Sequence, residues 1–286
     1  MRSSAQASLP GLQGEPARRP APLIVSASRR TDLPGYHAQL LADRVRRVAD
    51  DQRRSLYGLV LWTRYPAALL RPPLRPLLEG EVENVVVNLT VTGLGGSRLE
   101  PNVPATGDAI AAAVELVGLL GEPARLRWRF DPLLHGLSTF ELFESLAGPL
   151  AAVGVPTVTV SFPATMSLKG PLSPQYAAAG IAPWPGHAAK VGHARELLGR
   201  ARAHGLRLLA CCQPKIVRDV PGVEPAQCIP REVLEQLCQD GIPFPSRRDH
   251  TQRKHCQCLP SLDIGDYATD RCGSGCAYCY SRAGGP

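Results

Sequence analysis

The chain has 286 residues, enough to bury the core of one large α/β domain or of two small ones. Its formal net charge is +7, but only 4 of its basic residues are Lys, and the 28 Arg are scattered rather than gathered into a stripe. The basic composition therefore does not by itself indicate a nucleic-acid surface. No stretch approaches the roughly 18 apolar residues of a membrane span, so the sequence predicts no membrane partner.

The first part of the chain, residues 1–22, is rich in Pro and Arg and lacks the apolar core of a secretory signal. We expect it to be a disordered tail. The chain contains nine Cys, several of them in CxC and CxxC pairs. In a reducing compartment such thiols are more often metal ligands than disulfides, and we expect a cytoplasmic location.

Residues 23–241 alternate short apolar runs with helical patterns. In chain order the patterns predict strand 22–28, helix 36–50, strand 56–63, strand 84–93, helix 107–121, strand 124–132, helix 138–153, strand 155–162, helix 187–205, strand 206–214 and helix 231–241. Ser138 with Glu141 three residues later predicts a capping box at the start of its helix.

Strands that recur with helices between them predict a parallel sheet with right-handed crossovers. A closed eight-stranded barrel would need two more strand–helix units. The sequence therefore predicts an α/β fold, a six-unit (βα) partial TIM-type barrel over residues 23–241. Residues 242–286 would follow as a Cys-rich, cluster-binding tail packed on the barrel rim.

The end of the chain contains three closely spaced thiols, Cys272, Cys276 and Cys279. Gly273 and Gly275 give the backbone between the first two the freedom to wrap closely around a cluster. Three Cys ligands without an obvious fourth suit a 4Fe–4S cluster that leaves one iron open. The pattern C-x-x-x-C-x-aromatic-C, with Tyr278 as the aromatic residue, resembles the radical S-adenosylmethionine (SAM) enzymes, including spore photoproduct lyase. Its place at the C-terminus, rather than after the first strand, is unusual.

In parallel α/β folds the loops after the strands build the site, so polar residues there are candidates. The charged candidates for holding SAM or substrate are Arg29, Arg30, Asp32, Arg129 and Asp131. The polar candidates for binding a cofactor are Thr63, Asn88, Thr90, Glu100 and Asn102. Arg is suited to carboxylate or phosphate by its planar fork.

Each candidate also has a purely structural interpretation. Asp32 with a neighbouring Arg would close a turn as a local ion pair. Arg129 and Asp131 occupy alternate positions of one strand and face the same side, so an ion pair is as good an interpretation as a substrate clamp. The Thr and Asn residues would be hydrogen-bonded polar groups inside the barrel.

Four further cysteines, Cys211, Cys228, Cys256 and Cys258, are candidates for a second iron–sulfur or zinc site. An alternative is a zinc knuckle made from Cys256 and Cys258 with two of the last three cysteines. A zinc ribbon usually has two CxxC pairs, and only Cys276 and Cys279 have that spacing, which favours a cluster. Cys238 lies in a helical pattern and is interpreted as an ordinary buried residue.

The strings IVSASRRTDLP, LVLWTRYP, LEPNVP, RWRFDPLL and CQCLPSLDIGDYATDRCGSGCAYCYS together resemble the domain of unknown function 1848 family over residues 23–282. The resemblance implies an architecture and a cluster, but no reaction. It includes the four further cysteines, which favours them as a second site. The sequence departs from the family after the sixth strand, where Cys-x-Glu reads Cys-Cys-Gln, and before Cys272, where Tyr-x-x-Cys is longer.

These patterns predict an iron–sulfur enzyme of radical SAM type, with an unknown small-molecule or nucleic-acid substrate and an electron donor as partners. A non-catalytic metalloprotein, whose cysteines clamp the tail to the barrel, is one alternative. A nucleic-acid repair or processing protein is another, suggested by the many Arg residues and the likeness to photoproduct lyases.

Overall fold

The computed structural model describes residues 22–51, 55–163, 166–167, 170–237, 248–249, 251–266 and 268–280. The predicted disordered tail, apart from its last residue, lies outside the described residues, as does Cys238. Within the described parts of the chain, no helix is both long and apolar enough to cross a bilayer.

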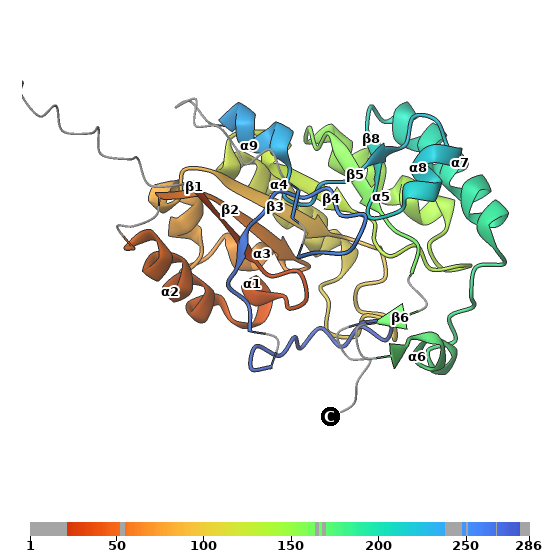
Figure 1. The fold of residues 1–286 in the computed structure, drawn as a ribbon, viewed down its shortest axis with the longest axis horizontal. Coiled ribbons are helices and arrows are strands. Elements are labelled where there is room, and N and C mark those ends of the chain that lie inside the picture. Colours follow the sequence, from red (N-terminus) through yellow and green to blue (C-terminus); the bar gives the residue numbers. More distant parts are fainter. Residues whose placement is uncertain are drawn as a thin grey trace, which may run out of the picture.

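One eight-stranded sheet organises the molecule, and all its neighbouring strands are parallel (Figure 1). Its strands are β1 (Pro22–Ala27), β2 (Ser55–Thr63), β3 (Val85–Thr90), β4 (Leu126–Arg129), β5 (Thr157–Val160), β8 (Arg207–Ala210), β9 (Glu224–Pro225) and β10 (Leu262–Asp263). Their order in the sheet is β10-β1-β2-β3-β4-β5-β8-β9. The predicted α/β class is confirmed, but the sheet has eight strands instead of six. The two additional strands are only two residues long, too short to give a periodic signal.

The two additional strands extend the sheet at opposite edges. β9 pairs with β8 and comes three residues before Cys228, whereas β10 pairs with β1 and comes four residues after Cys258. The segments that contain the predicted second-site cysteines are thus anchored at both edges of the sheet. A separate antiparallel pair, β6 (Met166–Ser167) and β7 (Gly170–Pro171), lies in the loop between β5 and the following helices.

The helices are α1 (Leu33–Tyr36), α2 (Ala38–Ala49), α3 (Pro66–Leu69), α4 (Thr106–Leu120), α5 (Phe140–Ala152), α6 (Ser173–Ala178), α7 (His187–Ala203), α8 (Pro214–Asp219) and α9 (Arg231–Leu237), with a π-helical turn at Leu77–Glu81 and a 3₁₀ turn at Pro123–Arg125. The predicted helix 36–50 is divided at His37 into two helices. The predicted capping box is wrong by one residue. Thr139 is the N-cap of α5 and accepts a hydrogen bond from the Leu142 amide, whereas Ser138 accepts one from the Leu134 amide.

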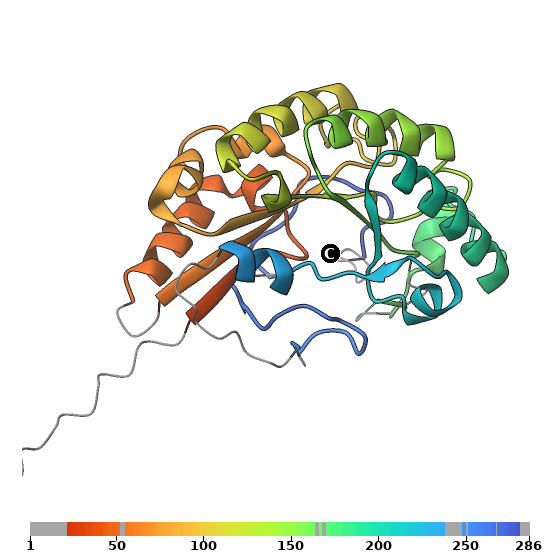
Figure 2. The same cartoon turned by 90° about the horizontal axis from the view of Figure 1, so that it is seen from above.

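The two faces of the sheet are covered differently because side chains alternate along each strand. The outer face, with Leu59 and Leu61 of β2, packs against an arc of helices (Figure 2). The inner face, with Val60 and Trp62 of the same strand, packs against α9 and against a cluster of buried cysteines. This inner face brings the cysteine-bearing segments next to the sheet.

Candidate functional site

Five cysteines gather on the inner face of the sheet; we call them the inner thiol group. Its members are Cys211, Cys212, Cys228, Cys256 and Cys258. All are free thiols, and all except the half-buried Cys212 are buried. Cys211 and Cys212 follow β8 directly, while Cys256 and Cys258 come from the segment before β10.

The thiols of the inner group interact pairwise in a closed ring. Cys211 interacts with Cys212 and Cys228. Cys256 interacts with Cys212 and Cys258, and Cys258 in turn with Cys228. The pKa of Cys228 is well below its ordinary value because this thiol interacts with Cys211 and Cys258 and lies near two arginines. The sequence candidates for a second site are therefore neighbours, and Cys212 joins them.

Cys212 was not among the sequence candidates. It has φ 52°, the left-handed region that few residues other than glycine adopt. Such a conformation is costly and persists only where the surroundings hold it in place. The sequence signal for Cys212 is its position next to Cys211 at the end of a strand.

Polar side chains surround the inner thiol group. Arg129 Nη1 donates a 2.9 Å hydrogen bond to Cys228 Sγ, and Asn88 Nδ2 donates one of 2.9 Å to the Cys228 carbonyl. Arg253 Nη2 lies 3.5 Å from Cys211 Sγ. Arg29, over the ring of Trp62, adds positive charge near Cys256.

The ion pair of Arg129 with Asp131 is present, as the structural interpretation predicted. Asp131 also accepts a hydrogen bond from Ser161. Because Arg129 uses its other amino group on Cys228, the ion pair and the thiol group share one guanidinium. Neither interpretation of Arg129 excludes the other.

Three cysteines of the tail form a second set of thiols, which we call the C-terminal thiol group. Its members are Cys272, Cys276 and Cys279. Cys276 is buried, and its burial raises its pKa to about 12, with the charges of Glu100, Cys279 and Cys272 acting in the same direction. Backbone hydrogen bonds join the loop to the β3–α4 loop, and Gln175 Nε2 of α6 donates hydrogen bonds to the Ala277 and Cys279 carbonyls. The loop runs beside α6 in Figure 1. The three thiols therefore lie at the carboxyl end of the strands, where the loops after β1, β2 and β3 meet.

A buried hydrogen-bond network adjoins the C-terminal thiol group. Glu100 is fully buried, and its Oε1 accepts hydrogen bonds from Arg64 Nη1 (2.8 Å), from Thr92 Oγ1 (2.8 Å) and from the hydroxyl of Tyr278. Its Oε2 is buried and has no hydrogen-bond partner. Arg64 also reaches the Tyr278 hydroxyl at 3.1 Å and lies 5.9 Å from the centre of its ring. Arg64 follows β2 directly, at a strand end where polar residues are site candidates.

Two sequence candidates hold loops in place. Asp32 is the N-cap of α1 and accepts hydrogen bonds from Gly35 N (3.0 Å), Thr63 Oγ1 (2.8 Å) and Arg64 N (2.6 Å). Burial raises the pKa of Asp32. Asp32 and Thr63 thus join the ends of β1 and β2, beneath the arginine that contacts Glu100.

The remaining candidates differ in their surroundings. Asn102 Nδ2 donates a 2.8 Å hydrogen bond to the Gly273 carbonyl and so holds the loop of the C-terminal thiol group. Arg30 is exposed to solvent, and Thr90 is half-buried at the end of β3. The Arg30 amide donates a 3.5 Å hydrogen bond to Ser28 Oγ.

Tyr280, the residue after Cys279, lies near arginines that contact the inner thiol group. Its hydroxyl donates a 2.9 Å hydrogen bond to the Arg29 carbonyl. Tyr280 also lies within electrostatic range of Cys279, Arg253 and Arg129. Side chains that contact the inner thiol group are thus next to a residue of the C-terminal motif.

The donor chemistry of both groups fits thiolate-bound metal. Thiolate is a soft ligand that selects iron–sulfur clusters, zinc and copper(I). Within the described segments, no three His, Cys, Asp or Glu side chains are arranged to hold one metal ion. A cluster distributes its thiolates over several irons, so it does not require them to converge on a single point.

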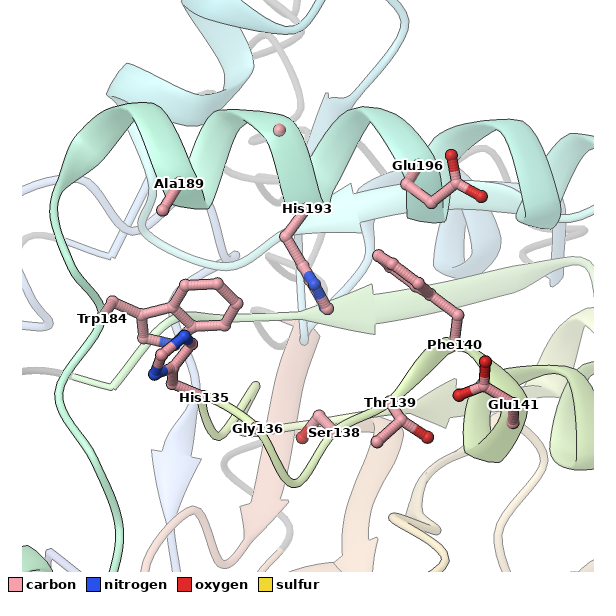
Figure 3. A pocket seen from close by; sticks show the side chains of 11 residues that line it. His135, Gly136, Ser138, Thr139, Phe140, Glu141, Trp184, Ala189, His193 and Glu196 are labelled. Atoms are coloured by element: carbon pink, nitrogen blue, oxygen red, sulfur yellow. The ribbon is translucent and has the colours of Figure 1, made fainter.

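A groove of about 570 Å³ lies elsewhere, between α7 and the loop that leads into α5 (Figure 3). Aromatic and histidine side chains line it. The ring of His193 stacks on Phe140 with 4.6 Å between ring centroids and lies edge-on to Trp184 with 4.9 Å between centroids. Burial and the nearby His135 lower the pKa of His193 to about 4. No thiol lines this groove, and the sequence analysis did not predict it.

Comparison with solved structures gives distant matches. The carboxyl transferase domain of Rhizobium etli pyruvate carboxylase matches with TM-score 0.37 and 13% identity, over 68% of this chain and 31% of that chain. This chain thus spans less than a third of that structure. The GH20 modules of the pneumococcal exo-β-D-N-acetylglucosaminidase StrH match with TM-score 0.34 and 9% identity, over 92% and 83% of the two chains.

Comparison with curated proteins gives no significant match. A family model, by contrast, matches residues 24–281, which include the inner face of the sheet and both thiol groups. The chain therefore belongs to the domain of unknown function family DUF1848.

Proposed function

We propose that the protein is an iron–sulfur enzyme of radical SAM type. In this proposal Cys272, Cys276 and Cys279 bind three irons of a 4Fe–4S cluster. The eight-stranded sheet would form a partial TIM-type barrel, and the Cys-rich tail would pack on its rim. The observation that carries the proposal is the position of the C-terminal thiol group, at the carboxyl end of the parallel strands, where (βα) folds build their sites.

When bound and reduced by one electron, such a cluster would donate that electron to SAM, whose C5′–S bond would break to give methionine and a 5′-deoxyadenosyl radical. The electron would come from a low-potential donor protein. The contribution of this chain is to hold and shield the site. Tyr278 and Glu100 hold the loop from one side, and Asn102 holds it at Gly273.

Arg64 lies within electrostatic range of the buried Cys276, and its charge opposes the effect of burial on the pKa of this thiol. A positive charge beside a thiolate-bound cluster stabilises the reduced and more negative form. The buried and unpartnered Oε2 of Glu100 supplies an acceptor for a cationic group of a bound cofactor or substrate. Arg29, Arg129 and Asp131 lie beside the inner thiol group and would contact the substrate.

Anaerobic reconstitution with iron and sulfide, followed by reduction in the presence of SAM, tests the proposal. We expect 5′-deoxyadenosine to form with wild-type protein and to disappear with Cys276→Ala. Arg75→Gln, which changes an exposed arginine paired with Glu79 at the surface, is the control and should retain cleavage. Wild-type protein that binds a cluster at these cysteines but never cleaves SAM would instead be a non-catalytic metalloprotein.

A further inference from the structure

We infer that the inner thiol group is a second metal centre, an iron–sulfur cluster held by Cys211, Cys228, Cys256 and Cys258, with Cys212 beside it as a free thiol. These four thiols are buried, with 6%, 8%, 8% and 3% of their surfaces exposed, whereas Cys212 is half-buried. Four thiolates are the usual complement of such a cluster. The inference does not depend on the C-terminal thiol group binding a cluster.

Hydrogen bonds that end on sulfur are the first observation. Cys228 Sγ accepts from Arg129 at 2.9 Å, Cys258 Sγ from the Cys228 amide at 3.1 Å, and Cys211 Sγ from Arg253 at 3.5 Å. A neutral thiol is only a weak acceptor. Donors directed at three of the four sulfurs indicate that these atoms carry negative charge, as thiolate ligands do, and such bonds tune iron–sulfur clusters.

A buried arginine beside the thiols is the second observation. Arg127 of β4 is 5% exposed and its Nε has no hydrogen-bond partner. The thiols of Cys228 and Cys258 and the carboxylate of Glu232 lie within its electrostatic range. Burying a charge is expensive unless an opposite charge lies nearby. A cluster with four thiolates has a net negative charge and would compensate Arg127 together with Arg129.

Four buried thiolates are also the ligand set of a tetrahedral zinc ion. Among the four proposed ligands, the contacts run from Cys211 through Cys228 and Cys258 to Cys256. The iron, zinc and sulfide content measured below distinguishes a cluster from a single ion.

The segments that supply the ligands are built into the sheet. Cys211 follows β8, Cys228 follows β9, and the Cys256–Cys258 segment leads to β10, at the opposite edge. Asn88 of β3 holds the Cys228 carbonyl at 2.9 Å. The centre would therefore join both edges of an open sheet across its inner face.

The test uses full-length protein purified without oxygen. In a variant with Cys272→Ala, Cys276→Ala and Cys279→Ala, we expect about four iron and four sulfide per chain to remain. Adding Cys228→Ser should remove them, whereas adding Cys212→Ser should not. Because the triple variant has no C-terminal ligands, a failure of the proposed SAM site would not affect this result.

Wild-type protein provides a second measurement in case the variants do not fold. Alkylation with iodoacetamide before and after iron chelation, read out by peptide mass spectrometry, should label the four ligand thiols only after chelation, and Cys212 in both states. Three results would overturn the inference: a triple variant that contains no iron or contains zinc instead, equal loss of iron with Cys212→Ser and Cys228→Ser, and labelling that chelation does not change.

Discussion

Arg129, the last residue of β4, donates a 2.9 Å hydrogen bond to Cys228 Sγ. Cys228 follows β9, and β4 and β9 are not neighbours in the sheet. The contact spans the inner face and joins a buried guanidinium to the thiol group. Arg129 also pairs with Asp131, so one side chain contacts both sets of candidate residues.

Arg129→Gln should make the reduction potential of the inner centre more negative, because removing a positive charge destabilises the reduced form. We expect a shift of about 60 mV, which corresponds to about 1.4 kcal/mol for a one-electron couple. A redox titration followed by electron paramagnetic resonance measures it. The control is Arg75→Gln, which removes an exposed arginine paired only with Glu79 at the surface. An equal shift in both variants would contradict a direct role for Arg129.

Glu100→Gln should destabilise the fold, because Arg64 would lose its buried ionic partner. Breaking a buried pair by removing one charge costs about 3–5 kcal/mol. Urea unfolding measures this loss. Glu79→Gln breaks an exposed pair with Arg75 and should leave the free energy of unfolding almost unchanged. If the two variants lose the same stability, the network around Glu100 is not a buried unit.

Gly273→Ala should lower iron binding at the C-terminal thiol group severalfold. A Cβ at this position would lie 2.4 Å from the ring of Tyr36, so the loop would have to move. Iron content of the anaerobically purified variant measures the effect. Gly107→Ala, in the first turn of α4, adds a Cβ with nothing within 4 Å and is the matched control. Undiminished iron in Gly273→Ala would show that the loop does not need its close approach to Tyr36.

Lowering the pH from 7 to 4 should lower the free energy of unfolding, because His193 in the groove is protonated more readily in the unfolded chain. Because the pKa of His193 is about 4 in the folded state and 6.5 in its unperturbed state, the unfolded chain binds the proton first as the pH falls. The stability present above pH 6.5 is thus lost progressively towards pH 4, by about 2 kcal/mol after allowance for solvent screening.

Urea unfolding at several pH values measures this contribution. His193→Phe keeps an aromatic ring on Phe140 and should flatten the pH dependence. The exposed His187, paired with Asp219, provides the control substitution His187→Gln. A wild-type profile identical to that of His193→Phe would refute the assignment.

The sequence predicted the parts of the fold that follow from local periodicity. Its strands with several β-branched residues, such as β3, are all present and parallel. It missed β9 and β10, because two residues have no period, and their pairing is decided by segments distant in the chain. The division of the predicted helix at His37 also has no local periodic signal.

The candidate site was predictable where residue chemistry is distinctive. Cysteine spacing identified the C-terminal thiol group and the Cys256–Cys258 pair, and the family resemblance added Cys211 and Cys228 to that pair. Strand ends identified Arg129 and Asp131. The partners of these residues could not be read from spacing. Arg64 reaches Tyr278 across 214 positions of sequence, and Arg253 approaches Cys211 across 42. Such contacts depend on how the tail returns to the sheet, which no local pattern encodes.

The central claim is that the cysteines bind iron–sulfur clusters. Iron, zinc and acid-labile sulfide in protein purified without oxygen, together with its visible absorption spectrum, test it most directly. We predict two clusters per chain, with equal amounts of iron and sulfide and the broad visible absorption of iron–sulfur centres. Colourless protein that contains zinc, or no metal after reconstitution, would contradict the claim.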